Sequence, residues 1–184
     1  PQQALALRGG RESQVLLVYV LARKLRDLNR VRVRGEEHPF TEAAIAEPVR
    51  RLRDVDQGDG LMRTNEAVWE LLRFGVAQDQ VIAGDRKSHN LRYIDWERPE
   101  NNAFHVTEEL SVSRTASDAT RRPDLVLYVN GIPFAVLECK RPGIKDPLAQ
   151  AVSQQIGYQR DDEIPRLYHY AQLLFALAVD QASY

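Results

Sequence analysis

The stretch that decides the fold is Arg121 to Pro142, RRPDLVLYVNGIPFAVLECKRP. It contains two apolar runs, Leu125 to Val129 and Phe134 to Lys140, whose β-branched and aromatic residues favour strands. Between them stands the dipeptide Asn130-Gly131, which is typical of a tight hairpin turn. The stretch therefore predicts a β-hairpin in the middle of the protein.

Charged residues stand at the far ends of both runs. Asp124 precedes the first run, while Glu138 and Lys140 close the second. Since residues i and i+2 of a strand face the same way, we expect Glu138 and Lys140 to project together. By the same alternation Leu137 and Cys139 point to the opposite face, and we interpret Cys139 as a core residue. A charge next to a core is costly unless something requires it, which favours a functional role over a solvated charge pair.

The register of the hairpin decides whether Asp124 and Glu138 meet. A plain two-residue Asn130-Gly131 turn would pair Asp124 with Leu137 and place the two carboxylates on opposite faces. A three-residue loop or a β-bulge would set Asp124 directly across from Glu138. A shared site therefore predicts one of these two irregularities.

Two neighbouring carboxylates are ligands for a hard cation. Together with backbone oxygens and water, Asp124 and Glu138 suit Mg²⁺ or Mn²⁺, and nothing nearby supplies the thiolates and imidazoles that zinc prefers. A metal held there could activate water towards a phosphodiester, while Lys140 steadies the charge that develops on phosphate. The arrangement is that of a hydrolytic nuclease site.

Helical spacing and short β-rich runs set the rest of the architecture. We expect helices over Val15–Leu28, over Thr41–Arg53 with Thr41 as N-cap and a kink or break at Pro48, from Thr64 or Asn65 to Gly75, and after Asp146-Pro147 with Leu148, Val152 and Ile156 along one face. We expect strands over Val76–Ile82, Leu91–Trp96, Phe104–Val112, Leu125–Val129, Phe134–Lys140 and Ala171–Val179, the last covered on both faces. These elements indicate an α/β fold, helical over 1–75 and sheet-containing over 76–184, in one domain of 184 residues.

Composition excludes several classes of protein. The 25 basic and 26 acidic residues give a net charge of −1, so any polyanion site must be local. One cysteine cannot form an internal disulfide, and cytoplasm is the default location. The longest apolar runs are far shorter than a membrane span. Because the chain does not begin with Met, we expect it to be a piece of a longer protein.

Several segments together resemble a known family. They are LRDLN (25–29), LLRFGV (71–76), YIDWERPENNAFHV (93–106), RPDLVLYVNGIPFAVLECKRP (122–142), QQIGY (154–158) and IPRLYHYAQLLFALAVD (164–180). The chain is similar to the N-terminal endonuclease domain of the R (HsdR) subunit of type I restriction enzymes, within the PD-(D/E)xK nuclease superfamily. The resemblance implies a restriction-endonuclease-like core, a mixed central sheet flanked by helices.

The resemblance also implies roles for individual residues. Asp124 and Glu138 would be metal ligands, Lys140 the catalytic lysine, and Gln154 with Tyr158 an element that contacts DNA or supports the site. The family's acidic residue on the first helix has no assigned equivalent here, although Glu12, Glu42, Glu66 and Glu70 lie in or beside expected helices.

Basic residues around the hairpin agree with a path for double-stranded DNA. Between Arg121 and Lys145 the charges sum to +3 if only Asp124 and Glu138 oppose them, and Arg121, Arg122 and Arg141 are the candidate DNA contacts or site supports. A second basic cluster, spread over residues 23–34, is better explained as solvated helix ends.

The resemblance implies Mg²⁺-dependent endonucleolytic cleavage of DNA in a complex with methyltransferase (M) and specificity (S) subunits. The chain has no Gly-rich phosphate loop followed by Lys-Ser/Thr, so ATP would bind only to a motor region outside it. Two alternatives stay open: a catalytically idle module that binds DNA or docks subunits of the same complex, and another PD-(D/E)xK nuclease acting in repair.

Overall fold

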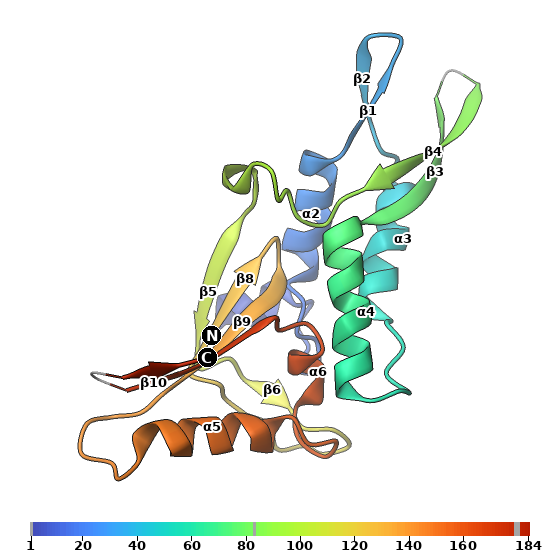
Figure 1. Ribbon diagram of the computed structural model, residues 1–184. Coiled ribbons are helices and arrows are strands. Elements are labelled where there is room, and N and C mark those ends of the chain that lie inside the picture. Colours follow the sequence, from blue (N-terminus) through green and yellow to red (C-terminus); the bar gives the residue numbers. More distant parts are fainter. Residues whose placement is uncertain (1, 83, 179–180) are drawn as a thin grey trace.

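The computed structural model describes residues 2–82, 84–178 and 181–184. Helices and strands alternate irregularly along the chain (Figure 1). The helices are α1 (Gln2–Leu7), α2 (Val18–Leu28), α3 (Glu42–Arg53), α4 (Leu61–Phe74), the 3₁₀ turn η1 (Pro99–Asn101), α5 (Pro147–Tyr158) and α6 (Pro165–Tyr168). The strands are β1 (Arg30–Val33), β2 (Glu36–Pro39), β3 (Val76–Ile82), β4 (Asp85–Leu91), β5 (Phe104–Glu108), β6 (Val112–Ser113), β7 (Thr120–Arg121), β8 (Leu125–Val129), β9 (Ile132–Cys139), β10 (Leu173–Leu177) and β11 (Ala182–Ser183).

One central sheet carries the hairpin. Its strand order is β11-β10-β9-β8-β5, with β9 and β10 parallel and the other neighbours antiparallel. The expected mixed sheet flanked by helices is therefore confirmed. Two further strand pairs, β1-β2 and β3-β4, project as separate ribbons beyond the ends of α2 and α3 at the top of Figure 1.

The helical expectations hold in part. Thr41 caps α3 as expected, because its Oγ1 accepts a hydrogen bond from the Ala44 backbone N at 3.2 Å. The predicted break at Pro48 is wrong: α3 runs through that residue without interruption. Pro48 costs the helix one backbone donor, while its carbonyl oxygen gains the buried Tyr93 hydroxyl as a donor at 2.8 Å.

Two helix starts were misplaced. The first long helix begins at Val18 rather than Val15, because the Leu17 backbone N donates to the Gly131 carbonyl at 2.8 Å instead of joining a helical turn. α4 begins at Leu61, ahead of Thr64 and Asn65, and its N-cap is Gly60. The expected end at Gly75 is confirmed by a φ of 73°, in the region that favours glycine.

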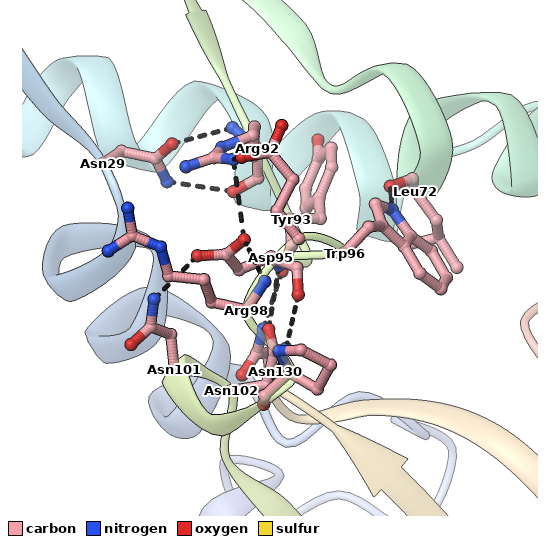
Figure 2. A network of polar contacts seen from close by, with 12 residues as sticks. Asn29, Leu72, Arg92, Tyr93, Asp95, Trp96, Arg98, Asn101, Asn102 and Asn130 are labelled. Atoms are coloured by element: carbon pink, nitrogen blue, oxygen red, sulfur yellow. Dashed lines mark hydrogen bonds and ion pairs between the residues drawn. The ribbon is translucent and has the colours of Figure 1, made fainter.

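The predicted strand over Leu91–Trp96 is wrong. After Leu91 the chain forms a loop whose backbone groups pair with side chains, as Figure 2 shows. The Asp95 carboxylate accepts from the Arg98 backbone N and from Asn101 Nδ2, and Asn130 Nδ2 donates to the Tyr93 carbonyl. Asparagine and aspartate thus replace the hydrogen bonds of a strand ladder, which apolar spacing alone does not reveal. The expected strand from Phe104 also stops early, at Glu108.

The sheet has one covered and one open face. Val126, Tyr128 and Val136 are buried beneath the helices, within the same core as Leu21 and Leu25 of α2. On the other face the larger side chains remain partly accessible, which overturns the expectation that the strand near Ala171 is covered on both faces. Leu173 is 39% exposed. Val179 of that predicted strand lies outside the described residues.

α5 packs on the protein through a face next to its predicted apolar row, of which only Leu148 is half-buried. Val152 and Ile156 are exposed, whereas Ala151 and Gln155 are buried. Gln155 is held inside because its Nε2 donates to the Phe175 carbonyl of β10 at 2.7 Å. A polar residue satisfied by the neighbouring strand therefore overrides the apolar spacing. Among the helices that the structure describes, none is long and apolar enough to cross a membrane.

The turn of the hairpin packs against the start of α2, and we expect Gly131→Ala to be destabilising. Gly131 has a φ of 82°, and a Cβ there would lie 2.6 Å from the Leu17 carbonyl oxygen. The obstacle is backbone rather than a flexible side chain, so we expect a loss of about 3 kcal/mol in the free energy of unfolding, measured by urea denaturation.

The matched control for this substitution is Gly143→Ala. Gly143 has a similar φ of 80°, but a Cβ there meets nothing within 4 Å. This variant should lose only the strain of the left-handed backbone, about 1 kcal/mol. Equal losses at the two glycines would show that the contact with α2 contributes nothing.

Candidate active site

A bulge in the hairpin brings the two carboxylates together. The turn is the two-residue Asn130-Gly131 type, with Val129 paired to Ile132, and both turn residues have positive φ. The register shifts between Leu127 and Tyr128, so one extra residue lies on β9 and Leu125 pairs with Leu137. The irregularity that a shared site required is therefore confirmed, as a bulge rather than a longer loop.

One residue beyond the Leu125–Leu137 pair, Asp124 lies across from Glu138 at the ends of β8 and β9. One oxygen of Asp124, Oδ2, accepts a hydrogen bond from the Cys139 backbone N at 2.7 Å. That bond fixes the carboxylate beside the end of β9. The Asp124 backbone is held as well, because its carbonyl accepts from the Glu109 N at 2.8 Å.

Glu138 is an almost fully buried carboxylate, with 1% of its surface exposed. Its Oε1 accepts from Lys140 Nζ at 2.9 Å, whereas its Oε2 is buried and has no partner among the described residues. Burial raises the pKa of Glu138 above its usual value; the hydrogen bond from Lys140 opposes this rise and the charge of Asp124 adds to it. An ionised Glu138 therefore has one oxygen left for a cation.

Lys140 is held between two acceptors. Its Nζ donates to Glu138 Oε1 and also to Gln154 Oε1, the latter at 2.6 Å. Gln154 in turn donates through Nε2 to the Tyr158 hydroxyl at 2.8 Å. The structure thus joins residues from the end of β9 and from one face of α5 in a single hydrogen-bonded chain.

The candidate basic contacts fall into two groups. Arg121 is engaged within the protein, since its Nε and Nη2 donate to the carboxylate of Glu163 at 2.6 and 2.8 Å. This arrangement corresponds to site support, and Glu163 offsets one of the positive charges counted from the sequence. Arg122 and Arg141 are exposed, and neither forms an ion pair within the described part of the chain.

Three features of the site were not found from the sequence. Cys139 was interpreted as core but is exposed, because it points to the open face of the sheet. Glu163 is 42 residues from Arg121, and no local pattern links them. Tyr168 is buried on α6 with a hydroxyl that lacks a described partner, and the charge of Glu138 adds to the effect of burial in raising its pKa.

No cluster of three or more His, Cys, Asp or Glu side chains suited to a metal occurs in residues 2–82, 84–178 and 181–184. A cation at this site would therefore have two side-chain ligands, Asp124 and Glu138. Two of the acidic residues considered for the first-helix position are already paired, Glu42 with Arg26 and Glu66 with Arg63.

Comparison with known proteins places the chain in a family. Residues 2–184 match the family model described as "Type I restriction enzyme R protein N terminus (HSDR_N)". The chain belongs to this family. The resemblance inferred from the hairpin and its neighbouring segments is thereby confirmed.

Individual relatives in the R protein family carry endonuclease names. The chain is 34% identical over 143 residues to the "Type I restriction enzyme HindI endonuclease subunit" of Haemophilus influenzae. It is 32% identical over 136 residues to the "Putative type I restriction enzyme MjaIXP endonuclease subunit" of Methanocaldococcus jannaschii. These matches cover 77% and 73% of the chain, but only 13% of the length of each relative.

Proposed function

We propose that this chain is the DNA-cleaving domain of a type I restriction enzyme R subunit, built around a PD-(D/E)xK-type site. The observation that carries the proposal is the bulged register, which sets Asp124 across from Glu138 beside the ammonium of Lys140. Membership of the R protein family and the endonuclease names of the relatives support the same reading.

Asp124 and Glu138 would hold a Mg²⁺ or Mn²⁺ ion. The side chains fit such an ion because both are carboxylates. Glu138 Oε2 is buried and has no hydrogen-bond partner among the residues that the structure describes, which is costly unless a cation or water satisfies it. When bound, a divalent ion of this kind polarises a phosphate oxygen and lowers the pKa of a water molecule.

Lys140 would steady the negative charge that develops on the scissile phosphate. An ammonium fixed in advance needs no reorganisation during the reaction, and the bonds to Glu138 and Gln154 fix it here. Tyr158 supports Gln154 from the same helix. Arg122 and Arg141 are exposed beside the site and would contact the DNA backbone, a contribution that does not depend on sequence.

Regions of the subunit outside this chain would supply the remaining functions. ATP would be used by a motor in the rest of the polypeptide, because this sequence contains no phosphate-binding loop. We propose that the subunit acts on double-stranded DNA together with methyltransferase and specificity subunits.

The test is cleavage of plasmid DNA by the full complex carrying Asp124→Asn in the R subunit. Asparagine keeps an acceptor for the Cys139 backbone N but removes the charge that a cation needs. We expect cleavage to fall at least about 100-fold at low Mg²⁺ and to recover in part as Mg²⁺ or Mn²⁺ is raised.

Two further measurements complete this test. DNA binding and assembly of the complex should be unchanged, and Asp118→Asn, in an exposed loop, should cleave like the parent. Cleavage by Asp124→Asn at the parent rate would favour the alternative of an idle docking module, and cleavage by the parent complex after removal of all divalent ions would overturn the proposed role of the metal.

A further inference from the structure

The open face of the central sheet is a second surface that the cleavage site does not use. It carries large apolar side chains from three strands and the preceding loop, and all of them are accessible. Their exposed fractions are 64% for Phe104, 59% for Val106, 45% for Trp96, 39% for Leu173 and 38% for Leu127.

These side chains line a single groove. Its volume is about 660 Å³, and it runs across β5, β8, β9 and β10. A second hollow shares Phe134 and Leu173 with it and extends the apolar surface to Met62 of α4, which is 76% exposed. A continuous apolar surface of this kind marks a site of interaction in a water-soluble domain.

The chemistry of the groove selects a protein occupant. None of the described residues that line it is Lys or Arg, and its one acid, Asp95, is already bonded to Arg98 N and Asn101. A nucleic acid or an anionic membrane needs positive charge, so this face suits neither. It suits the apolar side of a polypeptide segment.

The arrangement of the strands indicates which secondary structure the polypeptide segment in the groove adopts. β9 and β10 pair in parallel through the helical crossover of α5 and α6, and in α/β domains helices are the elements that pack on the faces of a sheet with such pairs. Here the helices cover the face that carries Val126 and Val136, while the face that carries Leu127 and Phe175 is open. The layer that would complete an α/β sandwich is a helix.

The remainder of the R protein is long enough to supply such a helix. The matching model is that of the N terminus of the R protein, and the relatives are about eight times longer than the stretch they share with this chain. We infer that an amphipathic helix from a later region of the same R protein packs into the groove on the open face. The inference rests on the family and the open face, and it stands whether or not Asp124 and Glu138 cleave DNA.

The test compares two valines in the full-length R protein. Val106 lies on the open face, and Val81 lies on the β3-β4 ribbon; both are on strands of antiparallel pairs and both are 59% exposed in this chain. Each is replaced by cysteine, a mild change of size, and the rate of maleimide labelling at that position is followed by peptide mass spectrometry. This readout separates them from native thiols such as Cys139.

If a helix covers the face, Val106→Cys should label at least about tenfold more slowly than Val81→Cys, and the two rates should become equal in denaturant. A photoactivated crosslinker at position 106 should then join a peptide of the same polypeptide outside these 184 residues.

Three outcomes would overturn the inference. Equal rates in the native R protein would show that the face is open. A difference that disappears on dilution, with a dimer in light scattering, would make the occupant a second copy. A difference that appears only when other subunits of the complex are added would make it a partner protein.

Discussion

Replacing Lys140 with alanine should lower DNA cleavage by the full complex about 1,000-fold while DNA binding and assembly persist. Within the described part of the chain, the ammonium is the only cation hydrogen-bonded to the buried carboxylate, at 2.9 Å from Glu138 Oε1. Its loss removes charge stabilisation at the phosphate, and a fixed group of that kind contributes about 100- to 1,000-fold. The measurement is the single-turnover rate of plasmid cleavage at saturating enzyme.

Two companion variants make the result specific. Lys87→Ala removes a lysine from β4, where it forms an exposed ion pair with Asp85, and should cleave like the parent. Gln154→Ala leaves the ammonium in place but removes its second acceptor, so we expect an intermediate loss of about tenfold. Parent-like cleavage by Lys140→Ala would show that this lysine is structural.

The sequence predicted the local parts of the site because they depend on short-range geometry. Glu138 and Lys140 lie on the same face because side chains of a strand alternate with a period of two residues. Gln154 and Tyr158 lie on the same face of a helix because they are four residues apart. The proximity of Asp124 to Glu138 could not be predicted from strand spacing alone, because a plain Asn-Gly turn places the two carboxylates on opposite faces. It could be predicted only on the assumption that the two residues share a site, which requires a bulge or a longer loop.

The rest of the site depends on contacts between distant segments, which periodicity cannot supply. Arg121 meets Glu163 because β7 and the segment before α6 are adjacent in space. Asn130 and Asp95 hold the loop after Leu91 through side chains, so its apolar residues imitate a strand without forming one.

Most errors in the predicted core share one cause. Cys139 was assigned to the core and the strand at Leu173 to a position covered on both sides, because an apolar strand was assumed to be buried on each face. In the structure one face of the sheet is open. The sequence therefore predicted correctly which residues share a face, but predicted wrongly that the residues on this face are buried. The inferred helix would cover the groove beside Leu173, and such a covering layer cannot be deduced from these residues alone.

Replacing Glu138 with glutamine should abolish cleavage and at the same time make the domain more stable. Glu138 is almost fully buried, its Oε2 has no described partner, and burial raises its pKa. A neutral amide of the same shape keeps an acceptor for Lys140 and removes the cost of burying the charge. The raised pKa indicates that burial, together with the charge of Asp124, outweighs the attraction of Lys140 for the carboxylate. We expect cleavage to fall at least about 1,000-fold, and the free energy of unfolding measured without divalent ions to rise by about 1 kcal/mol.

The opposite signs of the two effects separate a functional carboxylate from a structural one. A residue that only holds the fold together loses stability when it is changed, and activity falls as a consequence. When a buried carboxylate that serves as a metal ligand is neutralised, activity falls but the free energy of unfolding rises, because the unfavourable buried charge is needed only to bind the cation. Glu37→Gln, on the exposed β2 ribbon, should change neither quantity. A Glu138→Gln domain that unfolds more easily than its parent would assign this carboxylate to the fold, and Asp124 would then have no second ligand with which to share a metal.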